Sequence, residues 1–294
     1  MRKIFKDYKS SLKSSKVEEP INTFLYRPLA HLIVLLTRNT PVTPNQLTVV
    51  SFTFSMTSAF LFLFGNIQLG LVFLLLRQFF DCADGQLSRL TKKGTKYGAV
   101  LDQITDTIGI TSIITAIYLN QLFSTNNILI VPLGLISGVF VTIHIMYYDH
   151  FKASYEYYVL TNSDKNREPF TSVPPSSIYT GKKGLAKIFL YLYYNFFIAG
   201  MFLVRLSYIL HPEPIQKYSK NIHLDIYKKK LTFPMRLWSF FGPSTHYTAI
   251  IILILLNRLD FMTDLFLIYS NIALLAAIII QNIQYRSFAR AVSR

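Results

Sequence analysis

The chain is poor in charged residues, and acidic ones are the scarcest. Asp, Glu, Lys and Arg make up 15% of its 294 positions, whereas a soluble domain of this length carries about 25%. Hydrophobic residues make up 51%, and several windows of roughly 20 residues are apolar enough to cross a bilayer. This composition excludes an ordinary soluble domain and indicates a multi-pass membrane protein.

Cysteine is almost absent, since Cys82 is the only one, and an intramolecular disulfide is therefore excluded. The shortage of acids leaves a formal net charge of +15. On a soluble protein this charge would suggest nucleic acid, but here the basic residues lie in loops and tails between apolar segments. That distribution follows the positive-inside rule and suits anionic head groups. We expect a lipid bilayer, and no nucleic acid, as a partner.

Six segments are apolar and long enough to be transmembrane helices, so the expected fold is all-α and polytopic. They are 46–64, 66–89, 98–121, 127–148, 237–257 and 261–285. The stretch 21–38 is apolar but contains Arg27, Pro28 and His31, so we expect an interfacial amphipathic helix there. The resulting divisions are 1–45 (cytoplasmic tail and interfacial helix), 46–148 (spans one to four), 149–236 (cytoplasmic or interfacial insert, with 149–187 irregular) and 237–294 (spans five and six and a basic tail).

Loop charge decides whether the apolar stretch 188–210 also crosses the membrane. If it crosses, nine cations lie outside: Lys217, Lys220, Lys228, Lys229, Lys230, Arg236, Arg286, Arg290 and Arg294. If it does not cross, all of them lie inside and the external loops hold Arg258 alone. The positive-inside rule favours the second arrangement. We therefore predict six spans in the cell membrane, with both termini in the cytoplasm.

Two of the predicted spans contain acids. Asp81 and Asp84 lie in the second span, and Asp102 and Asp106 lie in the third. An Asp at mid-bilayer costs about 2.5–3.5 kcal/mol on insertion scales, so a bound cation is expected. The members of each pair are three or four residues apart and share one helix face. In an antiparallel hairpin Asp84 lies level with Asp102. Asp81 likewise faces Asp106, which predicts a four-carboxylate box that opens to the cytoplasm.

Carboxylates without a cluster of His or Cys are typical of sites for hard cations. Mg²⁺ or Mn²⁺ fits such a site, whereas zinc does not. Four carboxylates suffice for two ions about 3.5–4 Å apart. Two divalent ions cancel the four negative charges and leave coordination positions for phosphate oxygens. The expected substrate is a diphosphate, and the expected reaction is phosphoryl transfer.

The segment 81–106 reads DCADGQLSRLTKKGTKYGAVLDQITD. It resembles the signature of the CDP-alcohol phosphotransferases, D-x-x-D-G-x-x-A-R, then eight residues, then G-x-x-x-D-x-x-x-D. The matching positions are Asp81, Asp84, Gly85, Arg89, Gly98, Asp102 and Asp106. Ser88 departs, because the family has alanine there. TPVTPNQLT at 40–48 also resembles the family's Pro-Asn-x-x-Thr motif at the start of the first span, with Asn45 and Thr48 in place. The resemblance covers 20–150 and 235–285 but is poor between them.

The resemblance implies an enzyme that releases cytidine monophosphate when an acceptor hydroxyl attacks the β-phosphorus of a CDP-alcohol. It implies that Asp81, Asp84 and Asp102 are metal ligands. Asp106 would be both a ligand and the general base. Gly85 would let the nucleotide approach the helix backbone closely, and Arg89 would hold phosphate or orient a carboxylate. Further candidate binding positions are Asn45, Thr48 and Gly98.

The motif leaves the direction of transfer open. The leading interpretation has CDP-diacylglycerol, or an archaeal counterpart such as CDP-archaeol, as donor and a small polar alcohol or its phosphate as acceptor. The alternative has a CDP-polar alcohol as donor and a lipid alcohol as acceptor. A divalent-cation transporter is a third interpretation, because acids in spans also mark ion paths. A path would space its acids across the membrane, whereas these share one depth. We expect a homodimer, and the sequence does not identify the acceptor.

Overall fold

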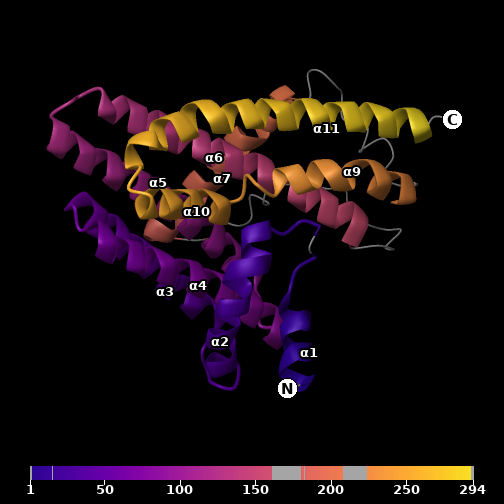
Figure 1. The fold of residues 1–294 in the computed structure, drawn as a ribbon. Coiled ribbons are helices and arrows are strands. Elements are labelled where there is room, and N and C mark those ends of the chain that lie inside the picture. Colours follow the sequence, from indigo (N-terminus) through magenta and orange to yellow (C-terminus); the bar gives the residue numbers. More distant parts are fainter. Residues whose placement is uncertain (1, 15, 161–179, 182, 208–223, 293–294) are drawn as a thin grey trace. The chain divides into compact units, whose positions relative to one another are not determined.

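The computed structural model describes residues 2–14, 16–160, 180–181, 183–207 and 224–292. Every secondary-structure element in these ranges is a helix (Figure 1). The chain forms two compact units: Met1–Thr142 with Gly242–Asn271, and Ile143–Phe241 with Ile272–Arg294. The first unit contains all the residues proposed for the site.

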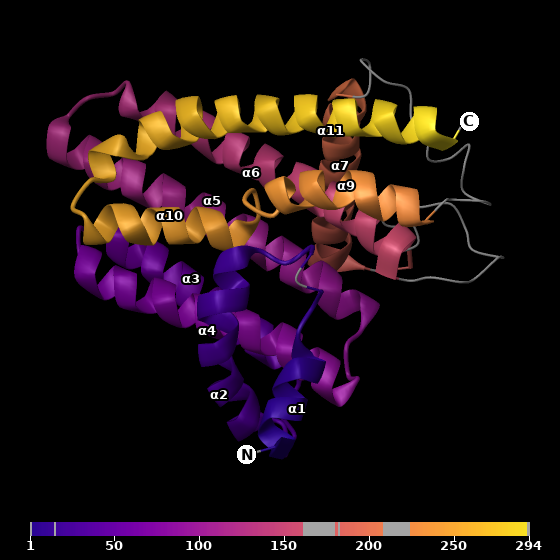
Figure 2. The same cartoon turned by 45° about the vertical axis from the view of Figure 1, so that its right-hand side comes forward.

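The first unit is built around three long antiparallel helices, of which α3 packs along both α4 and α5 (Figures 1 and 2). Its elements are α1 (Arg2–Ser11), η1 (Asn22–Tyr26), α2 (Arg27–Thr37), α3 (Pro44–Leu63), α4 (Ile67–Thr91), α5 (Lys96–Thr125), the first half of α6 (Ile130–Tyr155), α10 (Pro243–Leu255), η5 (Leu259–Phe261) and η6 (Asp264–Tyr269).

Local sequence explains where these helices begin and end. Thr43 and Gln46 form a capping box at the start of α3, with Pro44 in the first helical position. Lys92 adopts a left-handed conformation (φ 56°) and ends α4. The Thr95 hydroxyl then accepts a hydrogen bond from the Gly98 amide at 2.9 Å and caps α5. The short connection reverses the direction of the chain between α4 and α5, and both helices pack along α3.

The predicted amphipathic helix over 21–38 is helical from Asn22 to Thr37, as η1 and α2. One face is buried in a core shared with α3 and α4: Tyr26, Ala30 and Val34. The other face exposes apolar side chains at helical spacing: Leu25, Leu29, Leu32 and Leu36. An exposed apolar stripe is what a helix lying in a membrane interface requires.

Residues 1–19, expected as a tail, contain the helix α1, which contacts α4. Arg38 after α2 forms an ion pair with Asp7 of α1. The Tyr8 ring packs edge-on against His31 at 5.1 Å between ring centroids. These contacts fix the N-terminal segment against the helices of the first unit.

The second unit comprises the end of α6, η2 (Glu156–Leu160), α7 (Gly184–Ser207), α9 (Leu224–Trp238) and most of α11 (Ser270–Val292). Its centre is Trp238, which is fully buried and stacks on Phe151 at 4.5 Å between ring centroids. The indole N–H of Trp238 donates to Gln281 Oε1 of α11 at 3.0 Å.

The expectation of irregular structure over 149–187 is wrong for 149–160, where α6 and η2 continue the helix, and for 184–187, where α7 begins. Phe151, Tyr155 and Tyr158 are buried at helical spacing, and their burial stabilises the helix although polar residues lie between them. Residues 161–179 and 182 lie outside the described part of the chain.

The all-α, polytopic membrane fold is confirmed. Among the described residues, five helical stretches are long and apolar enough to cross a membrane: Pro44–Leu63, Gly98–Thr125, Ile130–Val159, Leu224–Leu255 and Leu259–Val292. They correspond to five of the six predicted spans. The sixth is α4, a helix of 25 residues that packs along α3 and contains four charged residues of the site: Arg77, Asp81, Asp84 and Arg89.

Candidate metal centre

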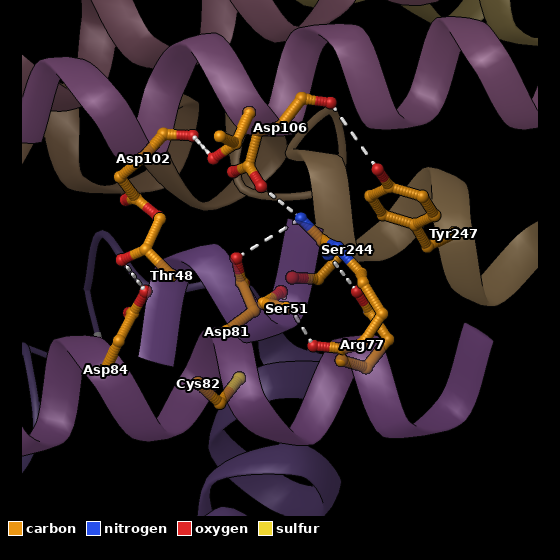
Figure 3. Close-up of polar contacts among 12 residues, drawn as sticks. Thr48, Ser51, Arg77, Asp81, Cys82, Asp84, Asp102, Asp106, Ser244 and Tyr247 are labelled. Carbon is orange, nitrogen blue, oxygen red and sulfur yellow. Dashed lines mark hydrogen bonds and ion pairs between the residues drawn. The ribbon is translucent and has the colours of Figure 1, made fainter. Parts of the chain in front are cut away.

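Three aspartates of the α4–α5 hairpin converge (Figure 3). Asp81, Asp102 and Asp106 each place one carboxylate oxygen within 4.8 Å of the other two. Asp102 and Asp106 are one turn apart on α5, and Asp81 reaches them from α4. Their side chains are only partly buried, so a ligand can reach the oxygens.

Asp84 lies one turn after Asp81 on α4 and is buried. It is not part of the group of three carboxylates. The Thr48 hydroxyl of α3 donates to Asp84 Oδ2 at 2.5 Å. Thr48, which the sequence marks as the threonine of the Pro-Asn-x-x-Thr motif, thus binds the side chain of Asp84, the remaining aspartate of the 81–106 motif.

Asn45 and Gly98 lie against each other where α3 and α5 begin. A Cβ atom on Gly98 would collide with Asn45 Oδ1. A side chain at position 98 would displace the Asn45 amide group from its present position, so glycine leaves room for Asn45 there.

Gly85 and Arg89 are one turn apart on α4, and the Arg89 guanidinium lies over the glycine. Both terminal nitrogens of Arg89 are 3.4 Å from the place that a Gly85 Cβ would occupy. Arg89 Nε donates to the Ser11 carbonyl oxygen at 2.5 Å. In the described part of the chain its Nη2 is buried without a hydrogen-bond partner. The guanidinium therefore has a donor left for a substrate group.

Arg77 also belongs to the site. Its side chain is 2% exposed, and Nη2 donates to Asp81 Oδ1 at 3.2 Å and also to Asp106 Oδ1. The ring of Tyr247 covers the guanidinium, with 4.0 Å from Arg77 Cζ to the ring centroid. A buried guanidinium with two carboxylates and an aromatic face is well compensated for leaving water.

Tyr247 of α10 is the residue that sequence reasoning misses. Its hydroxyl donates to the Asp106 backbone carbonyl at 3.4 Å, and the side chain is fully buried. No spacing rule connects position 247 with positions 77 and 106. The neighbouring His246 directs Nδ1 to the Gly242 carbonyl at 2.8 Å, within its own helix.

The donor set suits a hard divalent cation. The three grouped ligands offer carboxylate oxygens only, which favours Mg²⁺ or Mn²⁺ over zinc. The nearby Cys82 is buried, and its thiol points to Asn22 Oδ1 at 3.6 Å. The side chains in the cluster thus fit such an ion, in agreement with the chemistry that the sequence predicts.

Comparison with known proteins identifies relatives of this chain. The family model described as CDP-alcohol phosphatidyltransferase matches residues 41–208, more than half of the chain. The archaetidylinositol phosphate synthase of Pyrococcus horikoshii is 36% identical over 81 residues, which are 28% of this chain and 43% of that protein. The alignment with this curated relative spans less than half of the relative's length.

Proposed function

The chain belongs to the CDP-alcohol phosphatidyltransferase family, and we propose that it transfers the phospho-alcohol group of CDP-diacylglycerol or CDP-archaeol to a small polar alcohol or its phosphate. The products are a phospholipid and cytidine monophosphate. The observation that carries the proposal is the convergence of Asp81, Asp102 and Asp106 in one membrane hairpin, at positions of the family's motif.

In the proposed reaction, the acceptor hydroxyl oxygen forms a bond to the β-phosphorus of the donor. The bond from that phosphorus to the bridging oxygen breaks, and cytidine monophosphate leaves with the bridging oxygen. Asp106 accepts the hydroxyl proton as general base. Asp81, Asp84 and Asp102, together with Asp106, would hold two Mg²⁺ or Mn²⁺ ions. When bound, such ions stabilise negative charge on the attacking and leaving oxygens.

The residues around the carboxylates are proposed to bind the CDP-alcohol donor or to position the carboxylates. Without a side chain, Gly85 would let the nucleotide approach the backbone of α4 once the Arg89 guanidinium, which lies over the glycine, directs its unused donor to a phosphate oxygen. Thr48 orients Asp84, and Gly98 leaves room for the Asn45 side chain where α3 and α5 begin. These roles follow the family's motif and the contacts described above.

A lipid donor with a polar acceptor is preferred to the reverse arrangement. The relative is named as a synthase of archaetidylinositol phosphate, a product that combines a lipid part with a phosphorylated polyol. We therefore place an inositol phosphate among the first acceptors to test. The protein is proposed to act as a homodimer, with its termini and its site on the cytoplasmic side.

A panel of alcohols tests this function. Purified protein with Mg²⁺ is given CDP-diacylglycerol or CDP-archaeol and one alcohol at a time, and released cytidine monophosphate is measured. We expect release with one alcohol or alcohol phosphate well above the rate without acceptor. A second set of assays gives the protein a CDP-polar alcohol and a lipid alcohol. Release in this second set alone would mean that the roles of donor and acceptor are the reverse of those proposed. No release with any pair would contradict the proposal.

A further inference from the structure

Arg77 places a permanent positive charge where a metal ion is also expected. A guanidinium is not deprotonated in proteins, and this one contacts Asp81 and Asp106. Both carboxylates are proposed metal ligands. A divalent ion and Arg77 must therefore share these oxygens or compete for them.

Two further contacts hold the guanidinium in place. Its Nη1 donates to Gln78 Oε1, and the Tyr247 ring covers its face at 4.0 Å. Gly109 of α5 makes room for Tyr247, since a Cβ there would lie 2.8 Å from the Tyr247 hydroxyl oxygen. These contacts restrict the side chain to the neighbourhood of the two carboxylates.

The helix that supplies Tyr247 is itself anchored. The Glu19 carboxylate accepts hydrogen bonds from the Ser244 amide at 3.3 Å and the Thr245 amide at 2.7 Å. A carboxylate at a helix N-terminus satisfies its free amides and stabilises the helix. The position of the ring over Arg77 is thus fixed through α10.

We propose that Arg77, held by Tyr247, is a resident counter-ion that competes with the divalent cation for Asp81 and Asp106. This inference rests on the proposed function. With two divalent ions bound, Arg77 leaves the site with one positive charge in excess of the four carboxylates. The anionic diphosphate of the donor removes that excess, so donor binding and metal binding strengthen each other. Arg77 thereby weakens the binding of divalent ions when no donor is bound.

Metal binding without turnover tests the inference. Free Mn²⁺ is measured by electron paramagnetic resonance as it is added to wild-type protein, Arg77→Gln and Arg77→Lys, with and without a non-reacting CDP-alcohol analogue. We expect Arg77→Gln to bind Mn²⁺ about tenfold more tightly than wild type without the analogue, within the usual range of coupling between sites. The analogue should raise the affinity of wild type more than that of the variant. Arg77→Lys should resemble wild type.

The outcomes separate the inference from the function on which it rests. Arg258→Gln is the control, since Arg258 also lies over a ring, that of Phe261, but in an exposed connection; it should bind Mn²⁺ as wild type does. If wild type binds Mn²⁺ and Arg77→Gln binds it no more tightly, the counter-ion role is wrong. If wild type binds no Mn²⁺, the proposed function fails instead. Should Arg77→Gln not fold, Tyr247→Leu, which frees the guanidinium, must tighten Mn²⁺ binding, and an unchanged affinity would overturn the inference.

A second and independent feature lies in the second unit, on α9 and α11. Three basic side chains and a hydroxyl surround an open cavity of about 600 Å³: Lys230, Arg286, Arg290 and Ser287, with Ile283 and Ala291 completing the wall. A cavity of this volume accommodates a small ligand. Its charge favours a phosphate group.

The surface of α11 indicates which kind of phosphate compound this cavity would bind. Apolar side chains are exposed along one face of the helix and end beside the cavity: Ile272, Leu275, Ile279 and Ile283. The stretch Leu259–Val292 has 34 residues, or about 50 Å, which exceeds the roughly 30 Å of hydrocarbon. The face therefore changes from apolar to basic where the helix leaves the hydrocarbon, at the level of the lipid head groups.

From this position we infer that the cavity binds the phosphate of an anionic phospholipid head group. Thermal unfolding of the detergent-purified protein is followed during titration with phosphatidylglycerol, phosphatidylcholine or inorganic phosphate. We expect phosphatidylglycerol alone to stabilise the protein. Replacing Lys230, Arg286 and Arg290 by Gln together should weaken its apparent affinity at least about tenfold.

The matched control replaces Lys228, Lys229 and Arg258 by Gln, which removes the same charge outside the cavity. It should keep the affinity of wild type. Equal weakening in both triple variants would show that general charge, and no site, attracts the lipid. Stabilisation by inorganic phosphate without phosphatidylglycerol would point to a soluble ligand and would also overturn the assignment.

Discussion

Thr48 of α3 donates its hydroxyl to the Asp84 carboxylate of α4 at 2.5 Å, and both side chains are buried. The bond connects a helix without acids to the helix that contains two of the proposed ligands. A buried carboxylate without a donor is costly, so the first span contributes to the centre by orienting one of its carboxylates.

Replacing Thr48 by Val removes that donor at nearly constant volume. We expect the free energy of unfolding to fall by about 1–3 kcal/mol in the absence of metal, because the buried Asp84 Oδ2 loses the Thr48 donor. Saturating Mg²⁺ should reduce the loss, since the ion can satisfy the same oxygens. Thermal unfolding in detergent, with and without Mg²⁺, measures both effects. Thr53→Val is the control, since the Thr53 hydroxyl bonds the Val49 carbonyl of its own helix on an exposed surface. An equal loss there would contradict the assignment.

The variant Asp106→Asn tests whether Asp106 acts as the general base in addition to its proposed role as a metal ligand. The variant keeps its shape and one oxygen ligand but cannot accept the hydroxyl proton. Loss of a general base typically costs 10²–10⁴ in rate, so we expect a nearly inactive enzyme at every Mg²⁺ concentration that still binds the CDP-alcohol. Asp102→Asn should instead weaken metal binding and recover partly at high Mg²⁺. Recovery of Asp106→Asn with excess Mg²⁺ would show that Asp106 acts as a ligand only.

The location of the stretch 188–210 decides whether the six-span topology is correct. Residues 184–207 form α7, which runs across the direction of α11 in Figure 2 and not along it; residues 208–210 lie outside the described part of the chain. We expect α7 to lie at the cytoplasmic interface without crossing. In a background without Cys82, a cysteine at the exposed Lys229 should react with an impermeant maleimide only after permeabilisation.

The matched control for this experiment is a cysteine at Asn127, in the connection between α5 and α6, which is exposed and predicted to lie outside. It should react in intact cells. Reaction of the Lys229 position in intact cells would mean that 188–210 crosses the membrane and that the six-span topology is wrong.

His31 of α2 should make stability depend on pH. Burial lowers the pKa of His31 below its usual value of 6.5, the charge of Arg38 lowers it further, and Asp7 opposes them. The folded state therefore favours the neutral ring, and the unfolded state binds more protons below pH 6.5. Stability should be complete above that pH and fall as the pH decreases. His31→Phe, which keeps a ring against Tyr8, should unfold at a temperature that changes less between pH 7.5 and pH 5. Equal pH profiles would contradict this role.

The hairpin could be predicted from the sequence because its information is local. Helix periodicity places the acids of each pair on one face, and antiparallel numbering puts Asp81 level with Asp106. In the structure Arg77 bonds both of these aspartates. The capping box at Thr43 and the left-handed Lys92 likewise depend on neighbouring residues only.

Contacts between distant segments could not be predicted in this way. Glu19 caps a helix 226 positions further along the chain, and Tyr247 covers Arg77 from that same helix. No periodicity within one segment indicates such a pairing. The irregular structure expected over 149–160 was inferred from polar residues, although aromatic side chains at helical spacing, such as Phe151 and Tyr155, are buried there. Tertiary packing decided the structure of that segment.

The most direct test of the account is the metal dependence of cytidine monophosphate release from the CDP-lipid. Every grouped ligand in the proposed centre is a carboxylate, so activity should require Mg²⁺ or Mn²⁺. The account predicts that a chelator abolishes release and that Mn²⁺ added in excess restores it. Full turnover in the presence of the chelator would contradict a metal centre at Asp81, Asp102 and Asp106.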